Sequence, residues 1–314
     1  MNDLNAERDW LADEEDQGPR LSWAERNGFP NWLIGLGGLI VAFGSYFIIL
    51  NVGSLVILFS GGPLEGLSPE QIVERLLENP SSVIIVNSIA QFLGLALPVV
   101  LFALLARRGS SSELFRLNTG LNVLQWSVAA FVLTLAFWPV TMFLGYLNSI
   151  LPLPESVLNY NSEADKLLVS VIEGNVLFAI ANVAIVPAIC EELMYRGFGI
   201  TVLRRSWGIW PAIIIGGLCF GAMHMKPAAI IPLSTLGVVF GIITWKSGSL
   251  IPAMVAHFVN NAGSILLARQ YPQLMETEAV AESLPPFGLI LAGALISGVI
   301  FYFMFRFGAA EEHQ

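Results

Sequence analysis

Long apolar stretches separated by short polar segments run through most of the chain. Eight of them are candidates for membrane-spanning helices, because a span needs about 20 predominantly apolar residues. They cover residues 32–59, 81–106, 124–151, 174–203, 208–225, 228–245, 249–268 and 286–307. The pattern predicts an all-α, polytopic membrane protein with about eight transmembrane helices.

Two polar segments interrupt this pattern. Leu64–Pro80 alternates charged and apolar residues and is expected to form a short amphipathic helix outside the membrane. Ser68 is suited to cap that helix, with Pro69 at the first helical position and Gln71 at the third. Pro152–Lys166 is expected to be a polar loop.

Composition agrees with a membrane protein. Hydrophobic residues make up 55% of the chain and charged residues only 12%, whereas soluble domains carry about 25% charged residues. Residues 1–26 hold eight acidic side chains against three arginines and should form a solvated tail. Such a tail argues against binding to nucleic acid or to an anionic lipid surface.

The basic residues of the loops indicate the orientation, because cytoplasmic loops carry the excess of Lys and Arg. With the N-terminus inside, the inner segments hold ten: Arg8, Arg20, Arg26, Arg107, Arg108, Arg116, Arg204, Arg205, Lys246 and Arg306. The outer loops hold four: Arg75, Lys166, Lys226 and Arg269. Both termini are therefore predicted to be cytoplasmic.

Four regions follow from this organisation. Residues 1–30 form the acidic cytoplasmic tail, and 31–170 hold the first three transmembrane helices with their loops. Residues 171–270 carry the candidate chemistry, and 271–314 hold the last transmembrane helix and a C-terminal tail.

Two adjacent carboxylates, Glu191 and Glu192, close the apolar run that starts at Val176. A charged side chain at the bilayer centre costs about 2.5–3.5 kcal/mol on insertion scales, so an intramembrane ionisable residue indicates function. Glu192 lies four residues before Arg196, a spacing at which helical side chains can pair. Glu191 has no cation at that spacing. We therefore predict that Glu191 acts as a general base and that Glu192 is structural.

The two histidines outside the C-terminal tail can reach the same depth. A turn near Arg204–Trp207 makes an antiparallel hairpin, in which Glu191 and His224 both lie roughly 20–25 Å from the turn. His257, on the seventh span, requires a tilted or broken helix to join them. Three helices are thus predicted to present these groups to one polar cavity inside the bundle.

Further residues support this cavity at helical spacing. His257 and Asn261 lie four apart and could both donate to an oxyanion, whereas the adjacent Asn260 is rotated away. Phe220, four before His224, is expected to pack on its imidazole.

Structural roles are the alternative for each polar group taken alone. A membrane-embedded His or Asn often bonds a neighbouring helix, and Glu192 with Arg196 could be only an ion pair. Polar side chains that we expect to have interface or packing roles, without chemistry, are Glu173, Asn182, Asn87 and Gln91.

Three motifs follow one another in the chain: Glu191-Glu192-x-x-x-Arg196, Phe220-x-x-x-His224 and His257-x-x-x-Asn261. This ordered set resembles the three-motif signature of the CPBP family. This family comprises type II CAAX prenyl proteases and bacteriocin-processing, Abi-like relatives. The resemblance covers about residues 170–270. It implies an intramembrane endopeptidase in which Glu191 and His224 activate water while His257 and Asn261 hold the oxyanion. The resemblance implies a membrane-associated peptide or protein as the partner, with lipidated substrates among those that the family includes.

Two alternatives remain. Glu191, His224 and His257 could instead bind zinc and make the protein a metalloprotease, although the preferred mechanism needs no cofactor. A proton-coupled transporter, or a non-catalytic immunity or scaffold protein, would also bury Glu and His. Against a transporter, the sequence has no inverted repeat.

Overall fold

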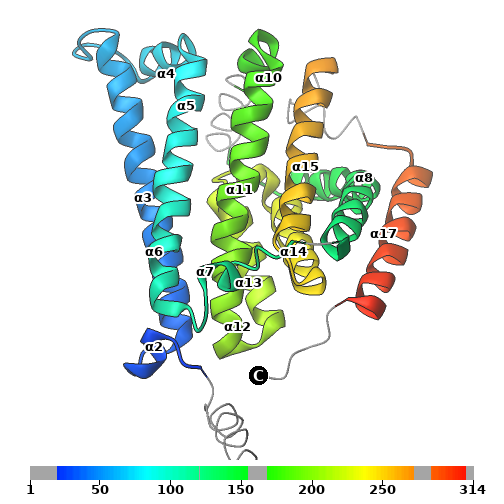
Figure 1. Cartoon of the computed structure of the whole chain (residues 1–314). Coiled ribbons are helices and arrows are strands. Elements are labelled where there is room, and N and C mark those ends of the chain that lie inside the picture. The colour runs from blue at the N-terminus through cyan, green and yellow to red at the C-terminus, as the bar shows by residue number, and fades with distance from the viewer. Residues whose placement is uncertain (1–19, 120, 155–167, 272–283, 309–314) are drawn as a thin grey trace, which may run out of the picture.

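The computed structural model describes residues 20–119, 121–154, 168–271 and 284–308, and these ranges form a helical bundle without strands (Figure 1). Most of its long helices follow the predicted spans. Their bounds are α3 Asn31–Ser60; α5 Pro80–Ala90, η1 Gln91–Ala96 and α6 Leu97–Ala106; α8 Leu121–Ser149; α10 Val176–Ala179, η2 Ile180–Ile185, α11 Val186–Glu192, η3 Leu193–Ile200 and α12 Thr201–Trp207; α13 Ile209–Met223; α14 Ile230–Ser247; α15 Ile251–Gln270; and α17 Phe287–Phe307. The all-α polytopic fold is confirmed.

Seven helices in the described ranges are long and apolar enough to cross a membrane. The exception is α13, which was expected to span residues 208–225 and has only 15 residues. At 1.5 Å per residue it covers about 22 Å, less than the roughly 30 Å hydrocarbon core. Met225 adopts a left-handed φ of 50° and Pro227 follows, so the helix cannot continue. The chain therefore turns at His224, inside the bundle.

The start of α3, the end of α6 and the end of α12 lie together at one end of the bundle, the lower end in Figure 1. There the Arg205 Nη1 atom donates to the Ala106 carbonyl, and the Trp32 backbone N–H donates to Ser206 Oγ. Gly208, with a φ of 79°, joins α12 to α13 at the predicted hairpin turn. The Leu250 N–H donates to the Arg116 carbonyl at the start of α15. This is the up-and-down pattern that the hydrophobic stretches predicted.

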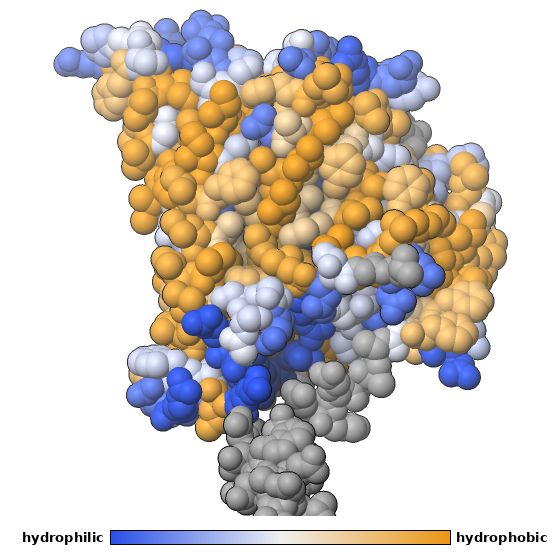
Figure 2. Space-filling view, in the orientation of Figure 1, coloured by the Kyte–Doolittle hydropathy of each residue, from blue (hydrophilic) through white to orange (hydrophobic). Residues whose placement is uncertain are grey.

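On the face shown in Figure 2, hydrophobic residues form a broad band, with hydrophilic residues at both ends. Many large apolar side chains of this band are exposed, such as Ile40, Ile48, Leu177, Leu295 and Tyr302. Exposed apolar side chains at this density suit contact with lipid. The protein is an integral, multi-pass membrane protein.

The short helix α4, Pro69–Leu77, lies outside the long helices, where an amphipathic helix was predicted. Ser68 Oγ accepts from the Gln71 N–H, and Gln71 Oε1 accepts from the Ser68 N–H. This reciprocal capping box satisfies N–H groups that the helix itself leaves unpaired. The capping prediction is confirmed. Most of the predicted loop Pro152–Lys166 lies outside the described residues.

Residues 20–30 of the acidic segment are held against the bundle, although the whole tail was expected to be solvated. They include the short helix α2, Trp23–Arg26, which a capping box of Ser22 and Glu25 starts. Glu25 pairs with Arg108 after α6 and accepts a hydrogen bond from Asn31 at the start of α3. This carboxylate therefore connects three segments at one end of the bundle.

The acidic pair lies between two wide helical turns that the sequence did not predict. The segments η2 and η3 are π-helical and flank the seven-residue α11, which carries Glu191 and Glu192. Pro187 has no N–H to bond the carbonyl four residues earlier, that of Val183. The Val183 carbonyl can therefore accept a hydrogen bond from another helix. π-Helical turns such as η2 and η3 are frequent at functional sites.

The orientation in the membrane stays a prediction that labelling can test. In a variant with Cys190 and Cys219 replaced by Ala, single cysteines at Ser110 and Ser68 lie near opposite ends of the helix that runs from Pro80 to Ala106. In intact cells, an impermeant thiol reagent should label Ser68→Cys and not Ser110→Cys. Permeabilised cells provide the control, since both should then react. Labelling of both in intact cells would contradict a cytoplasmic Ser110.

Candidate active site

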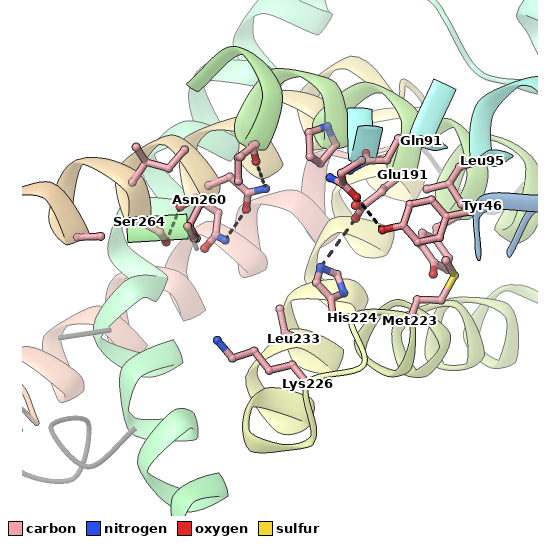
Figure 3. Close-up of a pocket in the computed structure, with 18 of the residues that line it drawn as sticks. Tyr46, Gln91, Leu95, Glu191, Met223, His224, Lys226, Leu233, Asn260 and Ser264 are labelled. Carbon is pink, nitrogen blue, oxygen red and sulfur yellow. Dashed lines mark hydrogen bonds and ion pairs between the residues drawn. The ribbon is translucent and has the colours of Figure 1, made fainter. Parts of the chain in front are cut away.

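A cavity of about 420 Å³ lies inside the bundle, between both halves of the chain (Figure 3). It is lined by Tyr46, Asn87, Gln91, Leu95, Leu168, Ile172, Val183, Pro187, Glu191, Tyr195, Met223, His224, Lys226, Leu233, Asn260, Asn261, Ser264, Ile265 and Ala268. About half of these are apolar, and the polar ones converge from α3, α5, η1, α11, η3, the α13–α14 turn and α15. Concave pockets where polar groups converge among apolar ones are typical of binding and active sites.

Among the described residues that line this cavity, Glu191 is the only acidic one. Its Oε2 atom lies 4.0 Å from Nε2 of His224 and 4.0 Å from Nε2 of His257. The same oxygen is buried and has no hydrogen-bond partner among the described residues. The three groups that were predicted to converge from three helices therefore do so around a single carboxylate oxygen.

His224 owes its position to the early end of α13. It is the residue that caps this helix, and its Nδ1–H donates to the Phe220 carbonyl at 2.7 Å. Phe220 also packs on the imidazole, with ring centroids 4.7 Å apart, as predicted. Because Nδ1 is used, the neutral ring has a lone pair at Nε2, which faces Glu191. The side chain is 32% exposed and reaches the cavity.

His257 lies behind the cavity wall and is not part of the lining, with 1% of its surface exposed. Its Nδ1–H donates to Glu192 Oε1 at 2.9 Å. The rings of Phe240 and Phe220 enclose the imidazole, with centroids 5.4 Å and 5.6 Å away. This packing fixes the ring and leaves Nε2 as the atom that faces Glu191.

Glu192 and Arg196 form the predicted ion pair, at 2.6 Å and with neither side chain exposed. Arg196 also donates to the Gly237 carbonyl at 3.0 Å and lies 4.5 Å from the centre of the Phe220 ring. A second role of Glu192 was missed, because this carboxylate also orients His257. Its partner comes from α15, 65 residues later, and no sequence spacing signals such a contact.

Asn261 faces the cavity and bonds the carbonyl that Pro187 leaves free. Its Nδ2 donates to the Val183 carbonyl at 3.1 Å, while its Oδ1 accepts from Asn260 Nδ2 at 3.2 Å. Trp138 in turn donates to Asn260 Oδ1 at 3.3 Å. Among the described residues, the second N–H of the Asn261 amide has no hydrogen-bond partner. Asn260 lines the cavity too, and it holds Asn261 in place, a role the sequence did not indicate.

The N-terminal half supplies a polar wall of the same cavity. Tyr46, Asn87 and Gln91 line it, although the last two were expected to have only interface or packing roles. Asn182, which was given the same role, does bond across a helix interface: its Oδ1 accepts from Ser88 at 2.8 Å. Asn87 and Gln91 lie four residues apart on one helix, and that spacing was the available signal.

Whether Glu191, His224 and His257 bind zinc stays a prediction that metal analysis can test. Among the residues that the structure describes, no three His, Cys, Asp or Glu side chains are arranged to hold a metal ion. The donor atoms of Glu191 and the two histidines are 4.0 Å apart in both pairs. A separation of 4.0 Å is longer than a direct hydrogen bond, so these atoms do not bond one another.

The bundle thus combines helices that are apolar enough to span a membrane with a cavity that Glu191 and His224 line. Residues 173–263 match the family model "Type II CAAX prenyl endopeptidase Rce1-like". This match confirms the CPBP resemblance that the three motifs predicted, and it supports a CAAX-type membrane endopeptidase in general. All seven motif residues lie inside the matched region. No curated protein and no solved structure matches the chain.

Proposed function

We propose that this protein is an intramembrane endopeptidase that hydrolyses a peptide bond in or near the membrane, with water activated by Glu191 and His224. The observation that carries the proposal is the buried, unpartnered Oε2 of Glu191, which lies 4.0 Å from His224 Nε2 at the wall of a cavity. The Rce1-like match supports the class of reaction.

The geometry suits a water held between base and imidazole. One water oxygen about 2.8 Å from each atom bridges a 4.0 Å gap. The Glu191 carboxylate removes a proton as the water oxygen bonds to the scissile carbonyl carbon, and the carbonyl electron pair moves to its oxygen. His224 Nε2 accepts the second water hydrogen bond and directs the attack. When the C–N bond breaks, the leaving nitrogen takes the proton from Glu191, which regenerates the carboxylate.

Asn261 is the donor best placed for the oxyanion in this mechanism. Its remaining amide N–H needs no change of protonation, and the bonds to Val183 and Asn260 hold it rigid. His257 donates through Nε2 only when both ring nitrogens are protonated, because its Nδ1–H is used on Glu192. We therefore assign Asn261 the main share of oxyanion stabilisation and His257 a supporting share.

The substrate we propose is a membrane-associated peptide, and a prenylated C-terminus is the class suggested by the family. An apolar cavity wall suits a lipidated chain, because each buried CH₂ group contributes about 0.8 kcal/mol. Leu95, Ile172, Leu233 and Ile265 give the cavity wall this apolar character.

Cleavage by the purified protein in lipid vesicles tests the proposal. The probe is a peptide ending in a farnesylated Cys, two aliphatic residues and a variable residue. We expect cleavage that EDTA and 1,10-phenanthroline leave intact, with well under one zinc per chain by metal analysis. Stoichiometric zinc and reversible loss of activity with phenanthroline would replace the Glu–His mechanism with a metal site of Glu191, His224 and His257. Proton-coupled uptake without cleavage would favour a transporter.

A further inference from the structure

Gln91 is a buried amide whose hydrogen-bonding capacity the protein does not use. It is 4% exposed, and its Oε1 atom has no hydrogen-bond partner among the described residues. Leaving a buried polar atom unpaired costs about 1–3 kcal/mol, so this atom needs an explanation. Gln91 lines the cavity and appears beside Glu191 in the close-up (Figure 3).

A second amide on the same wall is held in a fixed orientation. Tyr46 Oη donates to Asn87 Oδ1 at 2.8 Å. The bond occupies the Asn87 oxygen and turns its NH₂ group away from Tyr46. Within the described residues Asn87 makes no other side-chain hydrogen bond. Asn87 lines the cavity one helical turn from Gln91, and its amide carries two N–H donors.

Close backbone packing keeps Tyr46 at this wall. A Cβ atom on Gly94 would lie 2.4 Å from Tyr46 Cα, so only glycine lets α3 and η1 approach so closely. Gln91 is the first residue of η1, and η1 packs against α11, which bears Glu191. The N-terminal helices therefore place their amides opposite the proposed catalytic groups.

An extended peptide is the ligand that fits an unpaired amide beside a hydrolytic centre. A peptide unit carries one N–H donor and one C=O acceptor, which both need partners once they leave water. A glutamine side chain offers an acceptor oxygen and two donor hydrogens, the complementary set. Glu191, His224 and Asn261 are assigned to the water and the scissile carbonyl, and none of them pairs with the neighbouring peptide unit.

We infer that Gln91, supported by Asn87 and Tyr46, is a positioning residue that binds the substrate backbone next to the scissile bond. The inference rests on the proposed function, because it needs a peptide in the cavity. Gln91 accepts through Oε1 from a substrate N–H, and Asn87 donates to a substrate carbonyl. The first two transmembrane helices, which lie outside the matched family region, thereby contribute to substrate recognition.

Single-atom changes in the substrate test this contact. The farnesylated peptide is compared with esters in which one backbone N–H near the scissile bond is replaced by oxygen. With the wild-type protein, the ester at the contacted position should lower kcat/KM about tenfold, as loss of one hydrogen bond does. Gln91→Met, which removes the amide and keeps the length, should cleave the normal peptide about tenfold more slowly and show no further loss with that ester.

Ser88→Ala is the matched control, since Ser88 lies on α5 and bonds Asn182 away from the cavity lining. It should respond to every ester as the wild-type protein does. Each comparison is a ratio of two substrates for one variant, so it does not depend on how much of that variant folds. If every ester affects wild type and Gln91→Met equally, the inference is wrong. If the wild-type protein cleaves no peptide, the proposed function fails, and this inference fails with it.

Discussion

Glu191→Gln should lower the rate of peptide cleavage by a factor of about 10²–10⁴, the usual contribution of a general base. Gln keeps the shape of the side chain and removes its ability to take a proton from water. The fold should survive, because Glu191 Oε2 has no hydrogen bond to lose within the described structure. Cleavage by purified protein in vesicles and the thermal midpoint, measured on the same preparation, check both parts of this expectation.

The opposite assignment of the two acids would give a distinct result. If Glu191→Gln cleaves at the wild-type rate while Glu192→Gln is stable and inactive, Glu192 is the base. We prefer Glu191 as the base, because Glu191 lines the cavity and Glu192 does not.

Glu192→Gln is expected to act mainly on stability. Neither Glu192 nor Arg196 has any exposed side-chain surface, and removing one partner of such a buried pair costs about 3–5 kcal/mol. The change should therefore lower the thermal midpoint well below that of Glu191→Gln. It should also lower cleavage, since the charge that orients His257 is lost.

A double variant separates these two effects. Glu192→Gln with Arg196→Met removes both charges, and replacing a buried ion pair by apolar groups is often close to neutral. Its thermal midpoint should recover much of the loss, while cleavage should stay low because the carboxylate beside His257 is still missing. A Glu192→Gln variant as stable as the wild type would contradict the structural role of this pair.

The spans, the hairpin turn and the Glu192–Arg196 pair could all be predicted from the sequence, because each depends on local spacing. A run of apolar residues predicts a helix in lipid, and residues four apart share a helical face. The approach of Glu191 to His224 also followed from counting residues from one turn. The same reasoning could not set the length of α13, which ends where Met225 takes a left-handed conformation.

Contacts between helices that are far apart in the sequence could not be predicted from residue spacing. The bond from His257 to Glu192, and the support of Asn261 by Val183 and Asn260, depend on helix rotation and on π-helical turns. Helix rotation also brings Gln91 to the cavity. A glutamine in a membrane helix can equally well pack against a neighbouring helix. For Gln91, the Oε1 atom without a partner among the described residues favours substrate binding over packing.

The first half of the chain therefore belongs to the same functional unit as the matched region. Tyr46 and Gln91 line the cavity that holds Glu191, and α3 and η1 carry them there. A family match to residues 173–263 describes the proposed chemistry. The residues that contact the substrate are expected to come from both halves, which would let relatives with the same motifs recognise different peptides.

Comparison of membrane peptides from cells that carry either the wild-type protein or Glu191→Gln tests the central claim most directly. Quantitative mass spectrometry of the termini of membrane-associated proteins identifies the cleaved species without prior choice of a substrate. We predict a defined set of termini that is present with the wild type and replaced by uncut precursors with Glu191→Gln, at equal amounts of the two proteins in the membrane. Identical sets of termini in the two strains would contradict intramembrane proteolysis through Glu191.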